Sequence, residues 1–166
     1  MNELVRQPAE WIDKAPIKIR ASREIIASPD EVWAVLVAHE RWPEWFDTIE
    51  RAERTGGDGF GSTRSVWVKK WRIDEEFIVW DQPTAFGFII LAADGPLGRL
   101  SQTVLERIDI QVLSTDRVRV TYMQGFEARS KVAARILRLA SKGLMKAVDT
   151  ALVELATHIE RERAAG

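Results

Sequence analysis

The sequence predicts an α+β domain in which an antiparallel β-sheet packs against one long C-terminal helix. Between residues 48 and 126, runs rich in β-branched and aromatic residues are separated by short connections containing Gly, Pro, Asp and Ser. After Phe126 the spacing of apolar residues changes to the three-to-four-residue period of a helix. Short connections favour antiparallel hairpins, so the strands come first and the long helix closes the chain.

A strand followed by two short helices precedes this region. Residues 17–26, IKIRASREII, predict the first strand. Ser28 then supplies a helix N-cap, Pro29 suits the first helical position, and Glu31 faces the positive end of the helix, so residues 28–37 predict a short helix. Residues 39–46, HERWPEWF, predict a second short helix.

Six further strands bring the predicted sheet to seven. The connections that separate them lie at residues 55–62, 81–84, 93–98 and 114–116. The strands themselves are expected at residues 48–54, 63–70, 71–80, 85–93, 99–110 and 117–126.

The final helix carries a continuous apolar stripe from Ala133 to Ile159. Gly143 weakens its middle by about 1 kcal/mol relative to alanine. We therefore leave open either one kinked helix or a short preliminary helix that ends near residue 140.

Length and composition set the wider limits. A chain of 166 residues suits one domain, expected at residues 17–163, preceded by an N-terminal arm at residues 1–16 that is either docked or disordered. A net charge of −1 gives no general reason to bind nucleic acid, and the absence of cysteine excludes disulfides and thiolate chemistry. No stretch suits a signal peptide or a membrane-spanning helix, so we expect a cytoplasmic protein.

Two short motifs carry a family resemblance. They comprise Ser28, Pro29, Glu31, Val32 and Trp33, and then Trp42, Pro43, Trp45 and Phe46. With the order of elements and the Gly-rich loop, they resemble the START-like helix-grip (SRPBCC) superfamily, and its polyketide cyclase/dehydrase-like branch in particular, over residues 17–160. The resemblance implies a seven-stranded antiparallel sheet wrapped around the C-terminal helix, with two short helices between strands 1 and 2. It also implies an internal apolar cavity, used in relatives for lipids, hormones, quinones or polyketides.

Seven tryptophans, many for a chain of this length, fit either the wall of a cavity or a filled core. Family position and strand alternation together select the candidate ligand-binding residues Trp45, Phe46, Trp67, Trp71, Phe88, Tyr122, Leu137 and Leu144.

A few polar residues share the alternating face expected to point inward. Glu75 is in phase with Phe77, and Glu106 and Gln102 are in phase with Val104. Glu75, Glu106 and Tyr122 are thus the candidates for moving a proton, and Gln124 shares the phase of Tyr122. The alternatives are a phase slip at a bulge, or pairing of these carboxylates with Arg64, Arg72 or Arg119 near the rim.

Other reactive groups form no recognisable site. His39 and His158 have no partner at metal-ligand or triad spacing, so both are expected on the surface. The loop TGGDGFGS at residues 55–62 lacks the GKS or GKT ending of a phosphate-binding loop, and no GxSxG motif occurs. We expect no metal and no cofactor.

Basic residues recur along the outer face of the long helix at Lys131, Arg135, Arg138, Lys142 and Lys146. This basic stripe is either a solvated face or a docking site for an acidic partner or anionic lipid headgroups. The leading functional hypothesis is binding or carriage of a small hydrophobic ligand such as a lipid, quinone or polyketide. The alternatives are a metal-free, cofactor-free polyketide cyclase, aromatase or dehydratase, and a ligand-gated protein interaction module.

Overall fold

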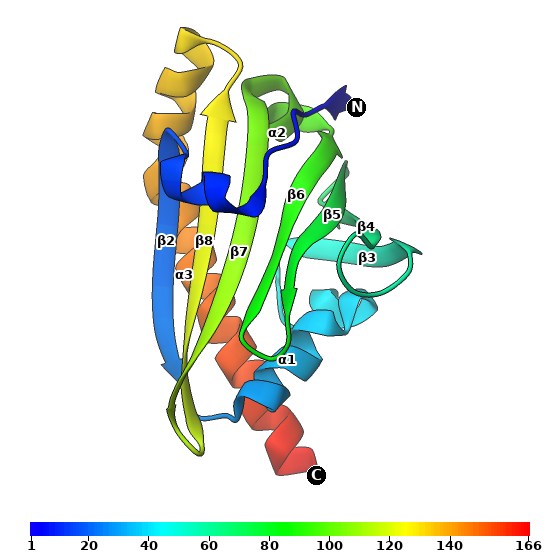
Figure 1. The fold of residues 1–166 in the computed structure, drawn as a ribbon, viewed down its shortest axis with the longest axis vertical. Helices are drawn as coiled ribbons and strands as arrows, with labels where there is room; N and C mark the ends of the chain where they lie inside the picture. Colours follow the sequence, from blue (N-terminus) through cyan, green and yellow to red (C-terminus); the bar gives the residue numbers. More distant parts are fainter.

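A computed structural model describes all 166 residues and has the predicted α+β helix-grip architecture (Figure 1). Seven strands form one antiparallel sheet in the order β2-β8-β7-β6-β5-β4-β3. Their bounds are β2 (Ile17–Ile25), β3 (Ile49–Gly56), β4 (Thr63–Val68), β5 (Trp71–Asp81), β6 (Ala85–Ala93), β7 (Ser101–Ser114) and β8 (Arg117–Ala128). A short strand β1 (Asn2–Glu3) adds to β6.

The long helix α3 (Lys131–Ala165) crosses one face of this sheet (Figure 1). It is a single helix through Gly143, which excludes the shorter preliminary helix ending near residue 140. Its apolar stripe supplies buried residues at Ala133, Leu137, Val148, Ala151, Leu152, Leu155 and Ile159. No helix of the chain is long and apolar enough to cross a membrane.

The two short helices between β2 and β3 follow the predicted local signals. In α1 (Pro29–Val37), Ser28 accepts a hydrogen bond from the backbone of Glu31, whose carboxylate accepts one from the backbone of Ser28. The next helix, η2 (His39–Glu44), is a 3-10 helix tied to α1 because the indole nitrogen of Trp42 donates to the carbonyl oxygen of Leu36 over 2.8 Å. Residues 45–48 join η2 to β3, and Trp42 of η2 lines the cavity described below.

One connection differs from the sequence-based expectation, and the N-terminal arm adopts one of the two states left open. Residues 93–98 do not form a simple turn, because a short helix α2 (Gly95–Leu100) joins β6 to β7. The N-terminal segment is docked: a 3-10 helix η1 (Ala9–Lys14) crosses the face of the sheet opposite α3 (Figure 1). A side chain at Gly125 of β8 would clash there, since a Cβ would lie 2.8 Å from Ala15 and 3.3 Å from Ile12.

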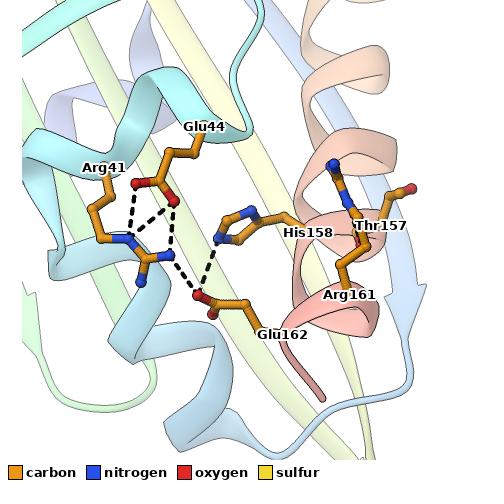
Figure 2. Close-up of polar contacts among 6 residues, drawn as sticks. All are labelled: Arg41, Glu44, Thr157, His158, Arg161 and Glu162. Carbon is orange, nitrogen blue, oxygen red and sulfur yellow. Dashed lines mark hydrogen bonds and ion pairs between the residues drawn. The ribbon is translucent and has the colours of Figure 1, made fainter. Parts of the chain in front are cut away.

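The C-terminal half of α3 is fixed to η2 by a polar network (Figure 2). Arg41 donates to Glu44 and, over 2.6 Å, to Glu162, which also lies 3.6 Å from the Nε2 atom of His158. His158 is buried, so its expected surface position is wrong: it lies on the side of α3 that faces η2. Residues 131–147 of α3 make no side-chain hydrogen bond or ion pair to another element, and packing alone holds that half.

Candidate functional site

A cavity of about 320 Å³ lies between α3 and the inner face of the sheet. Its wall is mainly apolar, with 14 hydrophobic residues among 20. One end of the wall is exposed to solvent and the other is buried. The exposed end contains Thr48, Pro96 and Ala147, and the buried end contains Trp42 and Phe88. The cavity therefore opens beside α2 and the middle of α3 and reaches inward to the sheet, and its volume falls at the lower end of the roughly 300–1,000 Å³ usual for ligand pockets.

Four polar side chains gather at the inner part of the wall. Glu75 comes from β5, Glu106 from β7, and Tyr122 and Gln124 from β8. Glu106 and Gln124 are direct cross-strand neighbours, and the hydroxyl of Tyr122 donates a short hydrogen bond to Glu106. Burial raises the pKa of Glu106 and, together with the adjacent carboxylate, raises that of Tyr122. These groups can orient a polar end of a ligand and can hold or transfer a proton.

Glu75 also belongs to a buried ion pair whose other member, Arg64, lies behind the wall. Arg64 of β4 donates to Glu75 over 2.5 Å, and the two residues are direct neighbours across β4 and β5. The Cζ atom of Arg64 lies 3.7 Å from the centre of the Trp42 ring, which adds a cation–π contact. Burial, partly opposed by the charge of Arg64, raises the pKa of Glu75 to about 7. Of the sequence-based alternatives, pairing with Arg64 occurs, but in the interior and not near the rim.

His39 also belongs to this interior cluster, so its expected surface position is wrong. Its ring lies fully buried, 4.9 Å from the ring of Phe77, and its Nδ1 lies 3.4 Å from Nη1 of Arg64. Burial and the positive charge of Arg64 lower the pKa of His39 to about 4. The first residue of η2 points inward here, where aromatic side chains from β5 and β6 surround it.

Most of the candidate site residues meet at this one cavity. Its wall contains the aromatic candidates Phe46, Trp71, Phe88 and Tyr122, the aliphatic candidate Leu144, and the two carboxylates Glu75 and Glu106. Trp71 stands at the rim, where its indole packs on Gly95 of α2: a Cβ added at Gly95 would lie 2.6 Å from the ring. Whether any of these residues binds a ligand remains a prediction.

Three candidates lie outside the wall. Trp45 is buried behind it, with its ring centre 5.0 Å from that of Trp42. Trp67 points to the other face of β4, where the guanidinium of Arg51 lies 4.3 Å from its ring centre. Leu137 is buried in the core one turn or more before the part of α3 that reaches the cavity.

Gln102 does not join the wall either, because the pairing of β7 with β8 shifts register between Ser101 and Thr103. The wall residues that sequence reasoning missed include Pro96 and Leu97 of α2, together with Trp42, Ile49, Val66 and Val68. Alternation in β4 could have identified Val66 and Val68, which share a face with Arg64. No sequence pattern indicated that α2 lines the cavity, because residues 93–98 predicted a turn.

Other candidate chemistry does not converge on a site. No group of three or more His, Asp or Glu side chains has an arrangement that could hold a metal ion. The Gly-rich loop connects β3 to β4, and none of its residues lines the cavity. The basic stripe is exposed along its whole length, and the large apolar side chains that α3 exposes beside it include Val132, Ile136 and Leu139. We call these three residues the apolar row.

Comparisons with known proteins agree with this architecture. The model of a protein family described as "Polyketide cyclase / dehydrase and lipid transport" matches residues 16–160. Curated proteins from Mycobacterium bovis and Mycobacterium tuberculosis are 30% identical over 81 residues, covering 47% of this chain and 48% of theirs. The match thus spans about half the length of these relatives.

Similar solved structures cover nearly the whole chain at low identity. An aromatase/cyclase from Streptomyces sp. R1128 is 16% identical with a TM-score of 0.70, over 90% of this chain and 98% of its own. A START superfamily protein from Mycobacterium smegmatis is 12% identical with a TM-score of 0.69, over 87% and 97%. A protein from Thermus thermophilus is 20% identical with a TM-score of 0.72, over 88% and 99%. At these identities the likeness shows the fold alone.

Proposed function

Because the chain belongs to the polyketide cyclase/dehydrase and lipid transport family of the START-like (SRPBCC) superfamily, we propose that it binds or carries a small hydrophobic ligand in its internal cavity. The ligand class is that of lipids, quinones, polyketides and similar molecules. The cavity itself carries the proposal, because its wall is mostly apolar and an exposed rim leads to it.

The energetics of such binding are sufficient. A ligand that buries roughly 300 Å² of apolar surface gains about 7 kcal/mol at about 25 cal/mol per Å². Costs of association and ordering oppose this gain, and polar contacts at the inner wall add to it. Because a Kd of 1 μM corresponds to about 8.2 kcal/mol, apolar burial alone gives binding weaker than micromolar, and contacts at the inner wall must supply the rest; no catalytic geometry is needed.

Native mass spectrometry of the protein purified from its own host, followed by calorimetric titration with a panel of apolar compounds, tests the proposal. A matched pair of variants on α3 locates the binding. Ala147→Trp places a large side chain at the rim, whereas Ala140→Trp adds the same ring to an exposed position outside the wall. We expect the first variant to lose binding and the second to retain it. Equal binding by both variants would contradict binding in this cavity.

A second candidate is an enzyme of the cyclase, aromatase or dehydratase type. The observation that favours it is the meeting of Glu75, Glu106 and Tyr122 on one wall, two of them carboxyl groups with raised pKa values. A shaped cavity would fold a reactive chain while one carboxyl group moves protons. Glu106→Gln would then abolish turnover of a polyketide-like substrate and leave its binding nearly intact. Unchanged turnover in both Glu75→Gln and Glu106→Gln would exclude this role.

We also propose that the partner of the basic stripe is an anionic lipid surface. The stripe offers the positive charge that such a surface attracts, and the apolar row beside it can enter the headgroup region. Leu144 and Ala147 lie on the same half of α3 and form part of the cavity rim. Docking of this half would therefore bring the opening of the cavity close to the membrane, where a hydrophobic ligand resides.

A further inference from the structure

The ionisable side chains of the cavity wall are acidic, and none is basic. Its 20 residues include three with carboxyl groups, Glu75, Asp94 and Glu106, and none with a basic side chain. The positive charge of Arg64 lies behind the wall and already pairs with Glu75. At the rim, Asp94 pairs with the amino group of Met1 over 3.0 Å. A negatively charged ligand would thus enter a low-dielectric space without a counter-ion of its own.

The inner wall also offers more hydrogen-bond acceptors than donors. The hydroxyl hydrogen of Tyr122 is directed to Glu106, so the Tyr122 oxygen keeps acceptor capacity but has no second hydrogen to donate. The carboxylate of Glu106 has further lone pairs beyond the one that Tyr122 occupies. The side-chain oxygen of Gln124 has no hydrogen-bond donor in the protein. Even with the two hydrogens of the Gln124 amide counted, the cluster has more acceptors than donors, because each ionised carboxylate offers about four lone pairs.

Both imbalances favour the same kind of ligand. A buried charge without a partner is strongly unfavourable, and an unpaired buried acceptor is unfavourable too. A ligand group that is uncharged and carries a hydrogen to donate avoids the first cost and removes part of the second. Burial raises the pKa of Glu75 and Glu106, which agrees with an interior that resists additional negative charge.

We propose that the cavity selects ligands whose polar end is an uncharged hydrogen-bond donor, such as a hydroxyl, phenol or amide, and rejects ligands that end in a carboxylate. This selectivity rests on the proposed ligand-binding function and narrows it: alcohols, phenols and hydroxylated polyketides are accepted, and ionised fatty acids are not. The donor is placed at Glu106, between Tyr122 and Gln124, with the apolar body extending toward the rim.

Isothermal titration calorimetry at pH 8 with four two-ring probes tests this selectivity. 2-Naphthamide and 2-naphthoate have nearly the same shape but differ in charge, and 2-naphthol and 2-methylnaphthalene differ in having a donor. We expect the amide to bind at least tenfold more tightly than the carboxylate, and the naphthol several-fold more tightly than the methyl compound. The Ala147→Trp variant should weaken binding of every probe that the wild type binds.

A pair of variants assigns the effect to the inner wall. Glu106→Gln removes one carboxyl group and replaces it with a donor, so 2-naphthoate should gain at least fivefold in affinity while 2-naphthamide changes less. Asp94→Asn makes the same change of charge at the rim, where the side chain is 36% exposed and water screens it, and should change the ratio of the two affinities by less than twofold.

The outcomes separate this inference from the function on which it rests. If amide and carboxylate bind equally, or the carboxylate binds more tightly, the charge selectivity is wrong while the cavity remains a binding site. The placement of the donor at Glu106 would also be wrong if Asp94→Asn changed the ratio of the amide and carboxylate affinities as much as Glu106→Gln does. If none of the four probes binds, the ligand-binding function and the selectivity are both refuted.

Discussion

Arg64 and Glu75 form an ion pair in the interior, with the Nε atom of Arg64 2.5 Å from the Oε2 atom of Glu75. Both side chains are almost completely buried, and the two residues face each other across β4 and β5. The pair thus borders the cavity, with Glu75 in the wall and Arg64 behind it. Each charge depends on the other, because a single buried charge is far less favourable than a buried pair.

Arg64→Met should lower the free energy of unfolding by about 3–5 kcal/mol, since it leaves the carboxylate of Glu75 buried without its partner. The double variant Arg64→Met/Glu75→Leu removes both charges and should lose distinctly less. Urea denaturation of the wild type and both variants at pH 8 measures the difference. A double variant as unstable as the single one would show that packing, and not charge pairing, dominates at this position.

The buried position of Arg64 was not predicted from the sequence. Alternation in β5 predicted correctly that Glu75 points inward, but Arg64 was considered only as a partner near the rim. The same alternation in β4 places Arg64 on the face of the buried Val66. Trp67, selected from family position and strand alternation, occupies the opposite face and lies against arginine side chains. Alternation in β4 therefore gives the inward face only when it is counted from Val66 and Arg64.

The fold itself followed from local patterns, whereas parts of the site did not. The helix cap at Ser28 and the apolar stripe of α3 are each encoded by residues close to one another in sequence. Both could therefore be predicted. The buried position of His39 depends on Phe77 and Arg64, which are distant in sequence and meet it only after the sheet has closed. The contribution of α2 to the cavity likewise depends on tertiary contacts, such as that between Gly95 and Trp71.

His39 and Glu75 should give opposite pH dependences of stability. The pKa of His39 is lowered from 6.5 to about 4, so the unfolded chain binds the proton more readily, and stability is lost as the pH falls from 6.5 to 4. The pKa of Glu75 is raised from 4.5 to about 7, so the folded state retains the proton, and stability is lost as the pH rises from 4.5 to 7. Between pH 4.5 and 6.5 the two trends oppose each other.

His39→Asn removes one of these trends and keeps an acceptor near Arg64. We expect the stability of this variant, relative to wild type, to decline as the pH rises from 4.5 to 6.5, by up to about 3 kcal/mol at 1.36 kcal/mol per pKa unit. Urea denaturation at pH 4.5, 5.5 and 6.5 measures the trend. The lost ring contact with Phe77 adds a constant difference only. Parallel stability curves for the two proteins would contradict a neutral, buried His39.

Gly95 and Gly143 should respond in opposite directions to replacement by alanine. Gly95 has φ = +63°, and a Cβ there would lie 2.6 Å from the indole ring of Trp71, so Gly95→Ala should destabilise the protein by about 1–3 kcal/mol. Gly143 lies within α3 with no atom within 4 Å of an added Cβ, so Gly143→Ala should stabilise it by up to about 1 kcal/mol. Thermal unfolding of both variants measures the two shifts. Equal shifts would indicate that Trp71 does not pack on α2.

Docking of α3 on an anionic membrane predicts that the protein cosediments with vesicles containing phosphatidylglycerol but not with vesicles of phosphatidylcholine alone. Arg135→Glu/Arg138→Glu should weaken this binding at least tenfold, because each basic residue near such a surface contributes about 1 kcal/mol. Arg20→Glu/Lys70→Glu changes the net charge equally at exposed positions away from α3, and it should retain most of the binding.

A substitution in the apolar row tests whether apolar side chains also contribute to vesicle binding. Leu139 is 85% exposed, so Leu139→Gln should leave the fold unchanged and still weaken vesicle binding several-fold. Salt distinguishes the two contributions, since 500 mM NaCl screens the attraction of the basic stripe but not the insertion of apolar side chains. If both double variants bind vesicles equally well and Leu139→Gln has no effect, α3 is not the docking surface. A wild-type protein that ignores anionic vesicles altogether excludes the lipid surface as the partner of the stripe.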